Sequence, residues 1–151
     1  MTDVPPQGAR VGPGVAAGVT EALIHCLVHA FYAEVRRDPV LGPIFDRAIG
    51  DGWDVHLAKL CDFWSSVLLM TGRFKGAPMA VHAQLAGIAP DHVRPEHFAR
   101  WLALFRATAV RVCPPAAAAL FVAKAETIGR SLQLGIAVSR GELPTMRAHP
   151  G

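Results

Sequence analysis

The sequence predicts an all-α protein with a single domain, and three observations support this. The chain has 151 residues, which is an ordinary length for one domain. Apolar side chains recur at helical spacing in several long segments, and proline or glycine separates these segments. No segment alternates apolar and polar residues as a half-buried strand would. We therefore expect about five helices with short connections around one core.

The composition excludes several classes of function. Hydrophobic residues make up 52% of the chain and charged residues only 18%, as expected if part of the apolar lining faces a ligand. The net charge is +3 with scattered Lys and Arg, so nucleic-acid binding is not expected. No apolar run approaches about 18 residues, so we expect no membrane span, and no signal peptide is visible. Cys26, Cys61 and Cys113 form no CxxC pair, so we expect neither a zinc site nor a redox pair. A reducing cytoplasm fits this cysteine usage.

The chain begins with a segment rich in proline and glycine. Residues 1–18 predict a mobile arm that precedes a domain over residues 19–139. Thr20 can cap a helix over residues 20–37, whose apolar stripe has Tyr32 at its edge. After Asp38 and a proline, we expect a short helical turn that ends at Phe45, followed by a loop over residues 46–51.

The next helix is predicted over residues 53–71, and its buried face includes a histidine. His56 shares one direction with Leu60 and Phe63, Trp64 flanks them, and Lys59 lies at the edge of that face. Glycines then bracket a loop, and a short helix over residues 77–86 carries a second histidine, His82. Two histidines on two segments, each beside an apolar face, could stand on opposite sides of a flat cofactor.

Proline marks the starts of the last two helices. Pro95 opens a helix over residues 95–113 whose stripe contains Phe98, Trp101 and Phe105. The proline pair at residues 114 and 115 separates this helix from one over residues 115–139. Residues 140–151 predict a flexible tail. Spacing alone leaves ordinary roles open for these side chains: Trp101 as a core ring, His56 bonded to a backbone carbonyl, and Lys59 as a solvated surface residue.

Three stretches in order resemble the group III truncated haemoglobins. The stretch FYAEVRRDPVLGPIF resembles the second helix of that family and the turn after it. The stretch HLAKLCDFWSSVLLMTGRFKGAPMAVH is similar to its distal helix, connecting loop and proximal histidine. The stretch FARWLALFRAT resembles the following helix with its haem-facing tryptophan. The resemblance covers about residues 20–138, and the glycine pairs typical of the other truncated groups are not evident.

The resemblance implies a truncated globin fold, with helices packed two over two around haem b. It implies that His82 coordinates the iron and that Tyr32, His56 and Trp101 form a polar distal trio. A neutral axial imidazole would leave one iron position open for a diatomic ligand. The remaining residues expected to contact the cofactor are Phe45, Lys59, Leu60, Phe63, Trp64, Phe98 and Phe105.

Three functional hypotheses follow. The first is a cytoplasmic haem protein, monomeric or weakly dimeric, that binds dioxygen, NO, CO, cyanide or sulfide and holds oxygen by distal hydrogen bonds. The second is a haem-dependent redox enzyme, of the NO dioxygenase or peroxidase type, that takes electrons from a separate reductase. The third is a haem-free helical interaction domain in which the His, Tyr and Trp residues are core residues. A red protein with a Soret band would exclude the third.

Overall fold

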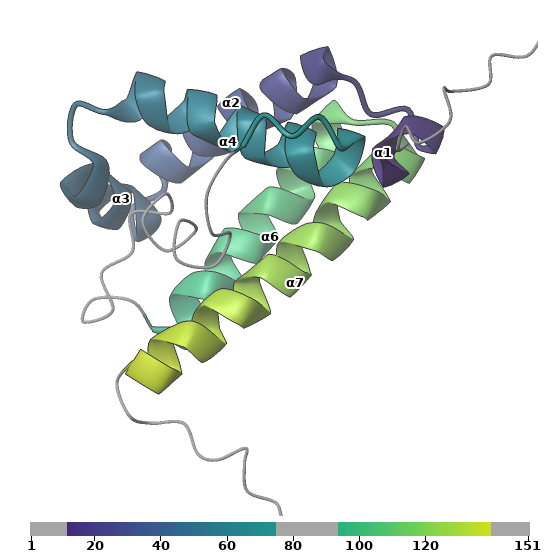
Figure 1. The fold of residues 1–151 in the computed structure, drawn as a ribbon. Helices are drawn as coiled ribbons and strands as arrows, with labels where there is room; N and C mark the ends of the chain where they lie inside the picture. Colours follow the sequence, from purple (N-terminus) through teal and green to yellow (C-terminus); the bar gives the residue numbers. More distant parts are fainter. Residues whose placement is uncertain (1–11, 75–93, 140–151) are drawn as a thin grey trace, which may run out of the picture.

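The structure, a computed structural model, describes residues 12–74 and 94–139, with side chains described as far as residue 134. Every regular element in these residues is a helix, which confirms the predicted all-α class (Figure 1). The helices in chain order are α1 (Pro13–Ala16), α2 (Glu21–Arg37), α3 (Leu41–Ile49), α4 (Trp53–Leu69), α6 (Pro95–Val112) and α7 (Pro115–Ser139).

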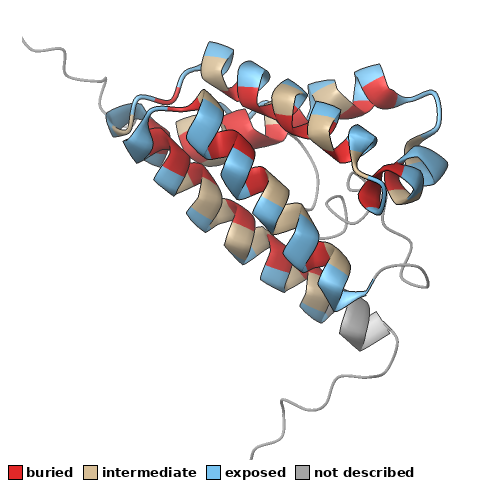
Figure 2. Cartoon of the chain, turned by 180° about the vertical axis from the view of Figure 1, so that it is seen from behind, coloured by how far each residue is buried: buried red, intermediate tan, exposed pale blue. Residues whose placement is uncertain are grey.

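Two helix pairs form two layers. Figure 1 shows α2 and α4 side by side across one end of the antiparallel pair α6 and α7, and α2 packs directly on α6. In Figure 2 the buried residues lie along the sides of the helices that face this junction. Fully enclosed side chains from both layers meet there, among them Ile24 and Phe31 of α2, Leu68 of α4 and Phe121 of α7. This is a two-over-two helical sandwich.

The capping residues set most of the helix boundaries that the sequence predicts. The hydroxyl of Thr20 accepts a hydrogen bond from the backbone N–H of Leu23 at 3.1 Å, and α2 begins one residue later than Thr20. Pro95 and Pro115 are the first residues of α6 and α7, where a missing N–H costs nothing. Helix α4 ends at Leu69 rather than at residue 71, because Met70 adopts a left-handed conformation with φ of 59°.

The prediction of a short turn ending at Phe45 was wrong. The carboxylate of Asp38 accepts hydrogen bonds from the backbone N–H groups of Val40 and Leu41, at 3.0 and 2.8 Å, which is the cap that the sequence predicts. The regular helix nevertheless begins at Leu41, because Pro43 has no N–H to donate to the carbonyl of Pro39. It continues through the predicted loop to Ile49, and Gly50 ends it with a φ of 60°. Helix α3 therefore runs a full turn beyond Phe45.

Part of the predicted N-terminal arm is packed. Helix α1 lies within residues 1–18 and contacts α4, and Gly14 is buried there. A Cβ atom added to Gly14 would lie 2.9 Å from the Cβ of Val19 and 3.0 Å from that of Leu68, closer than real side chains come. The packed part of the chain therefore includes residues that precede position 19.

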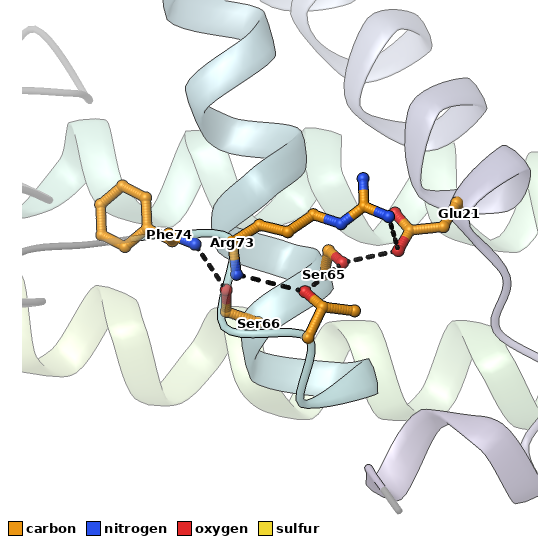
Figure 3. Close-up of polar contacts among 6 residues, drawn as sticks. Glu21, Ser65, Ser66, Arg73 and Phe74 are labelled. Carbon is orange, nitrogen blue, oxygen red and sulfur yellow. Dashed lines mark hydrogen bonds and ion pairs between the residues drawn. The ribbon is translucent and has the colours of Figure 1, made fainter.

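A polar cluster around the buried Ser65 joins the end of α4 to the start of α2 (Figure 3). Ser65, which is fully buried, donates to the carboxylate of Glu21 at 2.8 Å. Since its one proton is used there, the hydroxyl of Thr71, 2.7 Å away, donates to Ser65. Arg73 pairs with the same carboxylate at 3.5 Å, and the N–H of Phe74 donates to Ser66 at 2.8 Å. These bonds fix how the chain leaves α4.

None of the helices in the described ranges combines the length and the apolar character that a bilayer crossing requires. All three cysteines are free thiols, as the sequence predicts. Cys113 is buried and Cys26 is exposed. Burial raises the pKa of the Cys61 and Cys113 thiols to about 11, so both are protonated at neutral pH.

Candidate functional site

A small cavity lies where the two helix layers meet. The centre of a water-sized sphere can occupy about 30 Å³ of this cavity. A single water needs about 10–15 Å³ on this measure, so the cavity has room for a diatomic molecule. It contains six of the side chains that the sequence predicts for the site. Its lining is Val28, Phe31, Tyr32, Leu60, Phe63, Trp64, Trp101, Phe105, Ile128 and Leu132.

The three polar side chains predicted as a distal trio come together around Tyr32. The Tyr32 and His56 side chains are almost fully buried, and their ring centroids are 5.9 Å apart with the planes at 90°. The indole of Trp101 lies beside the Tyr32 hydroxyl closely enough to affect its ionisation. Two of the three residues line the cavity, and His56 stands behind Tyr32 outside the lining. Helices α2, α4 and α6 each contribute one member.

Two nitrogen atoms of this trio are buried without a partner. Neither Nε2 of His56 nor Nε1 of Trp101 has a hydrogen-bond partner among the described residues. Leaving such a group unsatisfied costs roughly 1–3 kcal/mol, so native structures usually satisfy it with water or a ligand. The apolar, aromatic lining matches a flat hydrophobic cofactor in its chemistry, whereas the volume of the cavity corresponds to a small ligand and not to the cofactor itself. A small polar ligand would supply the partner that these nitrogen atoms lack.

The trio is electrically neutral at physiological pH. Burial raises the pKa of the Tyr32 hydroxyl well above its usual range, although the neighbouring Trp101 indole partly opposes this. Burial, and secondly the positive charge of Lys59, lowers the pKa of His56 to about 4. Tyr32 therefore keeps its proton as a donor, and the imidazole of His56 has one N–H and one acceptor nitrogen.

The aromatic residues predicted to contact the cofactor form a connected wall. Trp64 of α4 stacks on Phe105 of α6, with ring centroids 5.8 Å apart and planes 13° apart. Trp101 also stacks on Phe105, with ring centroids 6.0 Å apart and planes 18° apart. Phe45 of α3 lies edge to face against Tyr32, with ring centroids 6.0 Å apart, and so contacts the wall without lining the cavity. Leu60, Phe63 and Phe98 are also buried.

Lys59 is not part of this wall. The Lys59 side chain is exposed, and its effect on the site is through its charge near His56. His82, the predicted iron ligand, lies outside the described residues.

Sequence reasoning did not assign four of the lining residues to the site: Val28, Phe31, Ile128 and Leu132. It also missed one large residue beside the cavity. Trp53, the first residue of α4, is buried and touches both Tyr32, with centroids 6.0 Å apart, and His56, at 5.7 Å. Its position before the first full helical turn gave it no partner in the apolar stripe. The signal available was its spacing of three residues before His56, which places both side chains on one helix face.

The two-over-two sandwich, and a Tyr, His and Trp gathered at an aromatic pocket within it, define a globin of the truncated type. No family model matches the chain. Two comparisons with known proteins agree with this class. The group 3 truncated hemoglobin ctb of Campylobacter jejuni is 38% identical over 90 residues, which is 58% of this chain and 67% of that protein. The crystal structure of the group III truncated hemoglobin from Campylobacter jejuni superposes with a TM-score of 0.69 at 31% identity, covering 78% of this chain and 91% of that one.

The chain therefore belongs to the group III truncated haemoglobins. This confirms the resemblance and the truncated globin fold that it implied. Membership makes the chain a globin-type haem protein, and the apolar pocket with its unpartnered nitrogen atoms is consistent with that.

Proposed function

We propose that this chain binds haem b with His82 as the axial ligand, and that it holds dioxygen and other small ligands beside Tyr32, His56 and Trp101. NO, CO, cyanide and sulfide belong to the same ligand class. The observation that carries the proposal is a pair of buried nitrogen atoms that lack partners among the described residues. Nε1 of Trp101 belongs to a residue that lines a cavity with room for a diatomic molecule, and Nε2 of His56 belongs to a ring that contacts Tyr32, another lining residue.

Bound haem supplies an iron atom with one coordination position open to a small ligand. The chain supplies the hydrogen bonds. Tyr32 is held neutral by burial, so its O–H is available to donate, and an indole N–H such as that of Trp101 can only donate. His56 is neutral as well, so it can either donate or accept. The surrounding rings exclude water, which makes each of these bonds stronger than it would be in solvent.

Strong donors in a dry pocket imply slow release of dioxygen. A hydrogen bond to an acceptor with negative charge contributes about 1.5–3 kcal/mol, which corresponds to roughly 10- to 150-fold in a dissociation rate. A protein that releases oxygen this slowly is a poor carrier. We therefore propose a sensing or protective role, in the cytoplasm and without nucleic-acid or membrane partners, rather than oxygen delivery.

The test is to load the purified chain with haem and follow its absorption spectrum in the ferric, ferrous and CO-bound forms. We expect a Soret band that saturates at one haem per chain and shifts when CO is added. A colourless protein after haem addition would refute the proposal. Steady turnover of NO or peroxide with an added reductase, instead of stoichiometric binding, would indicate the enzymatic alternative.

A further inference from the structure

Trp53 forms the wall behind the two polar rings nearest to it. It is the first residue of α4 and only 6% exposed. Its indole meets the imidazole of His56 edge to face, with centroids 5.7 Å apart and planes at 90°. It also lies against the phenol of Tyr32 at 6.0 Å. Since His56 and Tyr32 also contact each other, the three rings form a closed triangle.

Two charged side chains, which also pair with each other, hold the indole of Trp53 in place. Its Nε1–H donates to the carboxylate of Asp46 on α3 at 3.1 Å. The guanidinium of Arg36 on α2 lies over its ring, 4.6 Å from the centroid. Arg36 also pairs with the same Asp46 oxygen at 3.4 Å. We call Arg36 and Asp46 the tether of Trp53; it joins α2, α3 and α4 at the outer side of the ring triangle.

The tether lies at the surface, whereas the ring that it holds is inside. The side chains of Arg36 and Asp46 are each about half exposed, at 50% and 49%. They can therefore be changed without opening a cavity in the core, and their loss acts on the site through Trp53 alone.

His56 needs something to hold it inside. Its Nε2 atom is buried with no partner among the described residues, so the imidazole would gain a hydrogen bond by turning toward water. The Trp53 ring stands at right angles against it. A bulky ring that cannot move because two charged groups fix it will oppose that rotation.

We propose that Trp53, fixed by Asp46 and Arg36, is a positioning residue that keeps His56 and Tyr32 in their buried arrangement beside the ligand pocket. This inference rests on the proposed function, since it assigns a role to a residue that supports the ligand-binding side chains. Releasing the tether lets His56 swing outward, which loosens the pocket and admits ligand faster.

The first test measures His56 itself in the full haem-loaded chain. NMR titration of its imidazole in the diamagnetic CO form should give a pKa near 4 for the wild type and a value closer to the ordinary 6.5 for Asp46→Ala. Asp46→Asn, which retains an oxygen acceptor for the indole, should restore much of the wild-type value. Glu126→Ala is the matched control, because it removes an exposed ion pair with Arg106 that has no part in the tether.

The second test measures entry of CO after flash photolysis. Asp46→Ala and Trp53→Phe, which removes the N–H donor and keeps a ring, should each bind CO at least about fivefold faster, and Glu126→Ala should match the wild type. If Trp53→Phe does not fold, Asp46→Ala decides. An unchanged His56 pKa in Asp46→Ala overturns the positioning role, whatever the CO rate.

The two readouts separate this inference from the proposed function. A raised His56 pKa with an unchanged CO rate would support the role of Trp53 and contradict a part for His56 in ligand binding. A chain that takes up no haem would refute the proposed function, and the same His56 titration on the haem-free chain would still support or overturn the tether.

Discussion

Arg100 at the start of α6 donates through its Nε to the carboxylate of Asp38, 2.7 Å away and 62 residues earlier in the chain. The Asp38 side chain is only 7% exposed. The same carboxylate also accepts the N–H groups that begin α3. One side chain thus links the two helix layers and caps the helix that brings Phe45 against Tyr32.

Replacing Asp38 by Ala should destabilise the protein by about 1–2 kcal/mol, the usual cost of a lost helix cap with a charged partner. The Arg100 bond lowers the pKa of Asp38 below its ordinary 3.8. The ionised Asp38 carboxylate therefore contributes its full stabilisation above pH 3.8, its ordinary pKa. This stabilisation is lost as the pH falls through the lower pKa that Asp38 has in the folded protein. Urea unfolding of both proteins should give a constant difference from about pH 7 to 5 that narrows below the ordinary pKa. A loss no larger than that of Glu126→Ala would contradict this.

Ser65→Ala should lower the free energy of unfolding by about 1 kcal/mol, because it removes buried hydrogen bonds to Glu21 and Thr71 (Figure 3). Chemical denaturation measures the loss. Thr127→Ala is the control, because the Thr127 hydroxyl is exposed and bonds only within its own helix. It donates to the carbonyl of Ala123 and accepts from Arg130. Its effect should stay within about 0.5 kcal/mol. Equal effects for the two variants would mean that the polar cluster adds nothing to stability.

His56 should make the protein less stable in mild acid. Its pKa is about 4 in the folded protein, against 6.5 for a histidine in open solvent, so the unfolded chain takes up a proton that the folded chain refuses. Between these values stability falls by about 1.4 kcal/mol per pH unit, roughly 3 kcal/mol in all. His56→Gln removes this dependence, so its stability curve against pH should be flatter by that amount. Parallel curves for variant and wild type would show that His56 is not buried as a neutral group.

Removing the donors should accelerate oxygen release. Tyr32→Phe and Trp101→Phe should each raise the dissociation rate, measured by stopped-flow replacement of oxygen with CO, by about 10-fold or more. Because Trp101 acts on the Tyr32 hydroxyl, the double variant should show less than the product of the two single effects. Rates that stay at the wild-type value in all three variants would remove this part of the mechanism.

The sequence was a good guide where a short-range signal decides the structure. The cap at Thr20 and the prolines at 95 and 115 act on their own helix ends, so those helices begin where the pattern predicts, within a residue. It failed at the end of α3, where Gly50 and Gly52 had suggested a loop from residue 46. The chain stays helical as far as Ile49, and only Gly50 itself, with a φ of 60°, ends the helix.

The residues of the site show the same contrast between local and long-range signals. Tyr32, Trp64, Trp101 and Phe105 fall on apolar stripes, and the structure brings them to one cavity. Trp53 was missed because its importance comes from Asp46 and Arg36 on other helices.

The most direct measurement is the Soret absorption of a His82→Gly variant, titrated with haem in the absence and presence of free imidazole. We expect the variant to hold haem weakly, and imidazole to restore a spectrum like that of the wild type by occupying the vacated ligand position. His25→Ala, which removes an exposed histidine of α2, should leave the spectrum unchanged. A His82→Gly protein with the wild-type spectrum and affinity for haem would contradict the assignment of His82 as the iron ligand.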